Sequence, residues 1–231
     1  MTPQRCQDEA GPSSTQTREL PKVATGIMGL DEVLNGGLPE GRTTLISGGP
    51  GSGKSLVGLE FLYRGAVAGN PGIFVTFEER ADPVRQNART MDWDLAPLEQ
   101  DGKFFLMAPS VDPETVTSGD FSVKGLLAIL EGKATAMGAR RIVVDAVDVL
   151  MRLFDDPRRE RNELYILHNW LMDHEMTAVL SAKRSADPRL EDRYEFLDFM
   201  ADCVIHLDQR VAEQVPTRRV RVLKYRGSSY G

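Results

Sequence analysis

The sequence predicts an α/β fold in which a mostly parallel central sheet carries helices on both faces and ends in an antiparallel hairpin. Short, almost wholly apolar runs alternate with longer segments of helical periodicity, which is typical of parallel strands that are buried on both faces. A glycine-rich loop, "GGPGSGKS" at residues 48–55, lies between one such run and a helical segment. The last two strand-like runs follow one another without a helical segment between them, which favours an antiparallel connection.

Each element is placed by its apolar periodicity and by residues that start or stop helices. Thr25 is a possible N-cap for a helical segment around Leu30, and Gly36-Gly37 ends that segment. Asp82-Pro83 and Asp156-Pro157 each offer an N-cap followed by a first-turn proline. The expected strands cover residues 43–47, 72–77, 103–107, 140–145, 177–182, 203–207 and 218–225. The expected helices cover residues 56–69, a segment opening at 82, 123–138 and 156–174, with an irregular charged segment at 184–198.

The composition indicates an ordinary globular protein. The chain has 231 residues, of which 41% are hydrophobic and 27% charged, and its formal net charge is −6. This charge disfavours a protein that binds nucleic acid mainly by neutralising phosphates. Only Cys6 and Cys203 are present, so we expect no disulfide framework and a reduced, cytoplasmic chain. No run approaches the ~20 apolar residues that span a bilayer, so no membrane association is expected. Residues 1–21 have the composition of a disordered tail, and residues 22–231 are expected to form one domain.

The glycine-rich loop fits the phosphate-binding pattern G-x-x-x-x-G-K-[ST] through Gly48, Gly53, Lys54 and Ser55. Successive backbone N–H groups of such a loop turn inward, and the N-terminus of the following helix adds partial positive charge. Lys54 would reach the terminal phosphates, and the Ser55 hydroxyl would be a ligand of Mg²⁺. The predicted ATP-binding residues of the loop are Gly49, Gly51, Ser52, Gly53, Lys54 and Ser55.

Three acidic residues are candidates for the chemistry. Asp145 ends the apolar run "RIVVD", where its carboxylate could hold Mg²⁺ through water; the alternative is a solvated strand end. Glu78 and Glu79 follow a strand that should neighbour the loop strand, and a carboxylate there could orient and polarise an attacking water. The alternative for this pair is a solvated turn. Asp148 is expected to be exposed, and no role is assigned to it.

Lys224 and Arg226 lie two residues apart near the end of the chain. On a strand, the period of two would point both cations to one face. A strand at a distant sheet edge could not easily bring them to its own loop, so the γ-phosphate of a neighbouring copy is a more natural target. Judged from the residues alone, a basic and exposed strand end is the simpler interpretation.

Four stretches resemble the KaiC family, the circadian-clock branch of the RecA-like ATPases. They are "TGIMGLDEVLNGGLPEGRTTLISGGPGSGKS", "FVTFEE", "RIVVDAVDVL" and "LKYRGSS", and together they span about residues 22–229. The resemblance implies a RecA-like P-loop core, six-membered rings with ATP held between neighbours, and slow Mg²⁺-dependent hydrolysis with Glu78 and Glu79 as the catalytic pair. It also implies that Lys224 and Arg226 contact phosphates bound by the adjacent subunit, and that a clock-like or signalling protein is a partner. The chain resembles an N-terminal half, so autokinase activity is expected only of a longer two-domain protein.

Two departures from the family pattern and two other functions accompany this interpretation. Ala146 stands where the family often has Ser or Thr, and "LSAKR" at 180–184 leaves phosphate sensing by Ser181 or Lys183 open. One other function is a RecA/Rad-like DNA-recombination ATPase, but residues 184–198 carry three arginines against five acids, which is a poor phosphate-binding surface. The other is a nucleotide-gated scaffold with little turnover.

Overall fold

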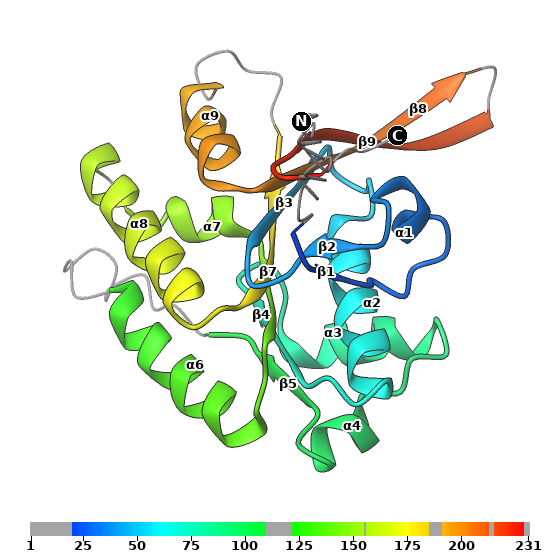
Figure 1. The fold of residues 1–231 in the computed structure, drawn as a ribbon, viewed down its shortest axis with the longest axis vertical. Coiled ribbons are helices and arrows are strands. Elements are labelled where there is room, and N and C mark those ends of the chain that lie inside the picture. Colours follow the sequence, from blue (N-terminus) through cyan, green and yellow to red (C-terminus); the bar gives the residue numbers. More distant parts are fainter. Residues whose placement is uncertain (1–19, 110–121, 155, 185–190, 213–214, 229–231) are drawn as a thin grey trace, which may run out of the picture.

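The computed structural model describes residues 20–109, 122–154, 156–184, 191–212 and 215–228 (Figure 1). Most of the predicted disordered tail, residues 1–19, lies outside the described residues. No helix in the described ranges is long and apolar enough to cross a membrane.

The centre of the molecule is a seven-stranded sheet with the order β5-β4-β6-β7-β3-β8-β9. Its strands are β3 (Thr43–Gly48), β4 (Gly72–Thr76), β5 (Phe104–Met107), β6 (Arg141–Asp145), β7 (Thr177–Lys183), β8 (Cys203–Ala212) and β9 (Val215–Tyr225). All neighbouring pairs are parallel except β8 and β9, which pair antiparallel. The predicted fold class, including its C-terminal hairpin, is confirmed. A separate antiparallel ribbon joins β1 (Lys22–Val23) to β2 (Leu38–Pro39), and the sequence analysis did not foresee it.

Helices cover both faces of the sheet. On one face lie α1 (Leu30–Val33), α2 (Lys54–Val67), α3 (Ala81–Arg89) and α4 (Ala96–Gln100), and on the other lie α6 (Val123–Met137), α7 (Val147–Met151), α8 (Pro157–Asp173) and α9 (Glu191–Met200) (Figure 1). The central strands supply both cores by simple alternation, as period two requires. Ile142 and Val144 pack in the layer of α6 and α8, whereas Val143 between them packs in the layer of α2.

The predicted helix starts have mixed outcomes. Asp156 is the N-cap of α8, and its side chain accepts a hydrogen bond from the Arg158 N–H at 3.1 Å, as predicted. The prediction for Asp82 was wrong, because α3 already begins at Ala81 and places Asp82 inside the first turn. There its negative charge still interacts favourably with the helix N-terminus. The cap position predicted for Thr25 was also wrong.

A loop contact replaces the Thr25 cap. The cap of α1 is Gly29, and the backbone N–H and hydroxyl of Thr25 instead both donate to Asp31 Oδ1 at 2.7 Å.

The prediction of an irregular segment at 184–198 was wrong over α9, whose Leu197 and Met200 are buried against the sheet. Residues 185–190 lie outside the described ranges. Strands β8 and β9 are longer than predicted, and residues of β8 beyond Leu207 pair with β9 alone.

Candidate nucleotide site

The loop between β3 and α2 requires glycine for two different physical reasons. Gly51 and Gly53 have φ of +71° and +99°, a left-handed backbone that glycine adopts without strain. Gly48 is instead required by packing, because a Cβ there would lie 2.4 Å from the carbonyl oxygen of Leu207 on β8. A Cβ at Gly49 would meet nothing within 4 Å, so the loop opens onto free space on that side.

Lys54 begins α2 and lies over the loop. It is buried, and its Nζ donates to the carbonyl oxygen of Gly49 at 3.0 Å. Burial lowers the pKa of Lys54, while the nearby charges of Glu78 and Asp145 act in the opposite direction. A partly desolvated ammonium beside open backbone N–H groups is suited to bind an anion.

Asp145 is the point where three strands and α2 meet. Strand register places it beside Thr76 of β4, and its Oδ1 accepts hydrogen bonds from Ser55, at 3.1 Å, and from Ser181 of β7. Burial raises the pKa of Asp145, and the two hydroxyl donors oppose that shift. The contact between Asp145 and Ser55 brings together a carboxylate and a hydroxyl, which are the oxygen donors that Mg²⁺ prefers.

Glu78 and Glu79 follow β4, and both backbone N–H groups donate to the Thr76 hydroxyl at 3.3 and 3.2 Å. Their side chains then differ. Glu79 Oε2 accepts a hydrogen bond from Asn87 of α3 at 3.4 Å. Partial burial, together with the charges of Asp145 and Asp148, raises the pKa of Glu78. Glu78 therefore interacts electrostatically with Lys54, Asp145 and Asp148.

The predicted exposure of Asp148 was wrong. This residue is 6% exposed and belongs to the buried end of α7. Its Oδ1 accepts from the backbone N–H of Lys183 at 2.9 Å, and its Oδ2 binds Arg152. Asp148 thus fixes the carboxyl end of β7, where Lys183 lies beside Gly48. Only the tertiary packing of α7 against β7 reveals this role.

A cavity of about 530 Å³ joins these groups, a size that suits a small-molecule ligand. Lys54, Ser55, Asp145, Glu78 and Glu79 line its polar side. The other side is formed by the apolar residues Leu59, Phe74, Val84 and Met91, with the polar residues Asn87 and Thr90 of α3 and the turn after it beside them. This side of the cavity could not be predicted from the motif, because nothing in the motif indicates that α3 packs near the loop.

Lys224 and Arg226 do not line this cavity. Tyr225 pairs with Cys203, and Cys203 pairs with Thr44, so the end of β9 lies beside the beginning of β3. The phosphate loop follows the other end of β3, so the six residues of that strand separate the two sites by on the order of 20 Å.

The two cations share one location at the end of α9. Lys224 Nζ donates to the carbonyl oxygens of Asp198, at 2.6 Å, and Phe199, at 3.3 Å. Arg226 also donates to the Phe199 carbonyl, at 3.1 Å, and its guanidinium lies 3.8 Å from Asp202. Within the chain, both cations are therefore occupied at the end of the sheet opposite the loop.

Comparison with known proteins assigns the family. A family model described as the KaiC ATPase matches residues 23–231. The chain belongs to the KaiC family. It is 40% identical over 219 residues to the circadian clock protein KaiC2 of Synechocystis sp., covering 94% of this chain and 38% of that relative. It is 34% identical over 220 residues to the circadian clock oscillator protein KaiC of Synechococcus elongatus, covering 94% and 42%. The chain thus spans less than half the length of these KaiC relatives.

A solved structure shows the same architecture. The KaiC-like protein of the hyperthermophilic archaeon Pyrococcus horikoshii superposes with a TM-score of 0.80 at 30% identity, covering 92% of each chain. The RecA-like fold and the resemblance to KaiC are confirmed. The chain is a KaiC-type ATPase domain, and membership of this family implies nucleotide binding.

Proposed function

We propose that this KaiC-type domain binds ATP with Mg²⁺ in the cavity beside the phosphate loop and hydrolyses it slowly within a hexameric ring of identical copies. One observation carries the proposal. The loop, Asp145 and Glu78 meet at the carboxyl ends of the parallel strands, while Lys224 and Arg226 lie at the opposite end. A site that includes these two cations would therefore require two copies.

The loop is suited to hold the triphosphate. Backbone N–H groups of Gly49, Gly51, Ser52 and Gly53 would face the phosphates, and Lys54 would exchange its bond to the Gly49 carbonyl for a phosphate oxygen. The Ser55 hydroxyl would hold Mg²⁺ directly and Asp145 would hold it through water, which their contact in the structure supports. When bound, Mg²⁺ neutralises charge that develops on the phosphate oxygens.

Glu78 is proposed as the general base and Glu79 as its orienting neighbour. The oxygen of water forms a bond to the γ-phosphorus, the bond to the β–γ bridging oxygen breaks, and ADP leaves. Glu78 accepts the proton of the attacking water. The raised pKa of Glu78 supports this role, because a carboxylate with a higher pKa is a better proton acceptor.

Lys224 and Arg226 are proposed to contact the phosphates bound by the adjacent copy. They cannot reach their own loop from the other end of β3. A cation supplied in trans stabilises the charge of phosphoryl transfer and often limits turnover to the assembled state.

The wider biological role follows the relatives. The two relatives compared above by sequence are named circadian clock proteins, and we include in the proposal a cytoplasmic location and a clock-like or signalling protein partner whose binding depends on the nucleotide state. Autokinase activity would belong to a longer two-domain protein.

The test measures molecular size and ATP turnover across protein concentration, with Mg²⁺ present. We expect specific activity to rise as the assembly forms, and the double variant Glu78→Gln/Glu79→Gln to bind ATP without releasing phosphate. A monomer with concentration-independent turnover would overturn the role in trans, and the absence of ATP binding would overturn the whole proposal. Stimulation of turnover by single-stranded DNA would favour a recombination ATPase instead.

A further inference from the structure

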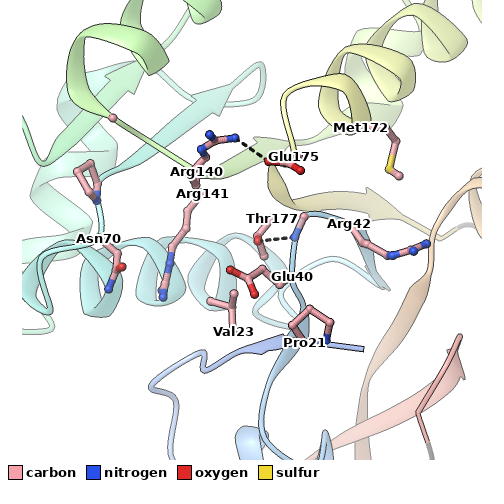
Figure 2. A pocket seen from close by; sticks show the side chains of 13 residues that line it. Pro21, Val23, Glu40, Arg42, Asn70, Arg140, Arg141, Met172, Glu175 and Thr177 are labelled. Carbon is pink, nitrogen blue, oxygen red and sulfur yellow. Dashed lines mark hydrogen bonds and ion pairs between the residues drawn. The ribbon is translucent and has the colours of Figure 1, made fainter. Parts of the chain in front are cut away.

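A second cavity, of about 750 Å³, lies at the amino ends of the parallel strands, far from the nucleotide site (Figure 2). It is lined by the segments that precede β3, β6 and β7, by the loop after α2, and by β1. The residues that matter here are Val23, Glu40, Arg42, Asn70, Arg140 and Arg141. Its volume is in the range of small-molecule sites.

The three arginines of this cavity differ in how they are bound. Arg42 forms an ion pair with Asp202 at 3.2 Å. Arg140 donates to the carbonyl oxygen of His174 at 2.8 Å and lies 3.4 Å from Glu175. The Arg141 side chain, by contrast, forms neither a hydrogen bond nor an ion pair with any residue in the described part of the chain, although its backbone belongs to β6. Its guanidinium is therefore the available donor group of the cavity.

The Arg141 side chain is held in place although its donors are unused. Its guanidinium lies over the Phe61 ring, 4.9 Å from the centroid. Gly65 makes room for it, since a Cβ at that position would come within 2.6 Å of Arg141 Nη1. The contacts with Phe61 and Gly65 restrict the guanidinium, and its N–H groups, which have no partner in the described residues, could bind a planar or tetrahedral oxyanion.

Nearby carboxylates do not satisfy Arg141. Partial burial lowers its pKa, and Asp31 and Glu40 attract it without forming an ion pair. Asp31 is committed to the backbone of Thr25 and Gly26, with contacts of 2.7 and 3.0 Å. A partly desolvated charge without a hydrogen-bond partner costs free energy, which a bound anion would recover.

We propose that this cavity binds a small ligand that carries one phosphate or carboxylate group on an apolar body. Arg141 would hold the oxyanion, and the Asn70 amide, which lines the same cavity and points the same way in Figure 2, would be a second donor. Val23 would contact the apolar body. Glu40 faces the same space and would repel a polyanion, so a monoanion is favoured over a triphosphate.

One other role would explain Arg141 without a ligand. Helix α2 ends at Val67, and a cation near the carboxyl end of a helix stabilises it. In that case Arg141 would contribute to stability, and the cavity would bind no anion. The two explanations make opposite predictions for binding.

The test is isothermal titration of the full chain with phenyl phosphate and, separately, with benzoate, at constant ionic strength. We expect saturable binding of at least one probe, and we expect its affinity to fall about tenfold or more in Arg141→Gln. The loss should be smaller in Arg141→Lys, because lysine keeps the positive charge but cannot donate two hydrogen bonds to one oxyanion as a guanidinium can. Arg140→Gln is the matched control, and it should bind within about twofold of the wild type because Arg140 is already engaged. The tighter probe identifies the preferred oxyanion.

Binding at the nucleotide site is separated by Lys54→Ala, which should leave probe binding unchanged. Asn70→Ala is a second variant in case Arg141→Gln lowers stability, since the Asn70 side chain is exposed and it too should weaken binding. No saturable binding of either probe, binding that survives both Arg141→Gln and Asn70→Ala, or binding that Lys54→Ala abolishes would each overturn the proposal. These outcomes do not depend on whether the chain hydrolyses ATP.

Discussion

Mixing two inactive variants tests whether each nucleotide site is shared. Lys54→Ala removes the ammonium of the phosphate loop but keeps Arg226, whereas Arg226→Ala keeps the loop but lacks the cation offered to a neighbour. Alone, each variant should lose on the order of 10³-fold in turnover or more, as expected for a loop lysine or a cation that acts in trans. In a random equal mixture, half of the copies keep the loop and half of their neighbours keep Arg226. About one quarter of wild-type turnover should therefore return, whatever the number of copies in a closed ring.

The assay is phosphate release after the two variants are combined as dissociated chains and allowed to assemble with Mg²⁺ and ATP. The control mixes Arg226→Ala with the double variant Lys54→Ala/Arg226→Ala, a mixture that contains intact loops but no Arg226 and should stay inactive. If mixed assemblies form and no activity returns, the reasoning from the opposite ends of β3 is refuted. Full activity of Arg226→Ala alone would refute it equally.

Three further predictions concern single positions. Turnover should fall as the pH is lowered through a value above the ordinary carboxylate range, because partial burial raises the pKa of Glu78 and the base must be ionised; a profile with an ordinary carboxylate midpoint would contradict the assignment. Gly37→Ala should lower the free energy of unfolding in urea by about 3 kcal/mol, because Gly37 has φ +131° and the new alanine Cβ would lie 2.1 Å from the Val23 carbonyl oxygen. An unchanged midpoint of urea unfolding would show that the loop can relax. Asp156→Ala should cost about 1 kcal/mol in thermal unfolding through the lost bond to the Arg158 N–H, whereas Asp156→Asn should retain most of the stability.

The features that the sequence predicted well depend on neighbours along the chain. The phosphate loop is contiguous, and its backbone geometry follows from glycines whose positions are visible in the motif. The central strands are buried at nearly every position because both faces of the sheet are covered, so short and mostly apolar runs mark where they lie. The capping of α8 by Asp156 is likewise local, since donor and acceptor are two residues apart.

The features that it missed depend on contacts between distant segments. Ser181 reaches Asp145 because β7 lies beside β6 in one particular register, and Asp148 is buried because α7 packs against β7. Helix α9 was hidden by its charges, although Leu197 and Met200 have the spacing of a buried helical face. The cavity around Arg141 has no motif at all, because five separate segments supply its wall.

The direction of β3 determines which phosphate loops of an assembly would receive cations from a neighbour. If Lys224 and Arg226 of each copy contact the phosphates bound by the next copy, an open row of copies leaves the phosphate loop at one end without these cations. Closing the row into a circle repairs that last loop. The fraction of catalytically inactive sites in a preparation would then indicate how many assemblies are still open rather than closed into rings.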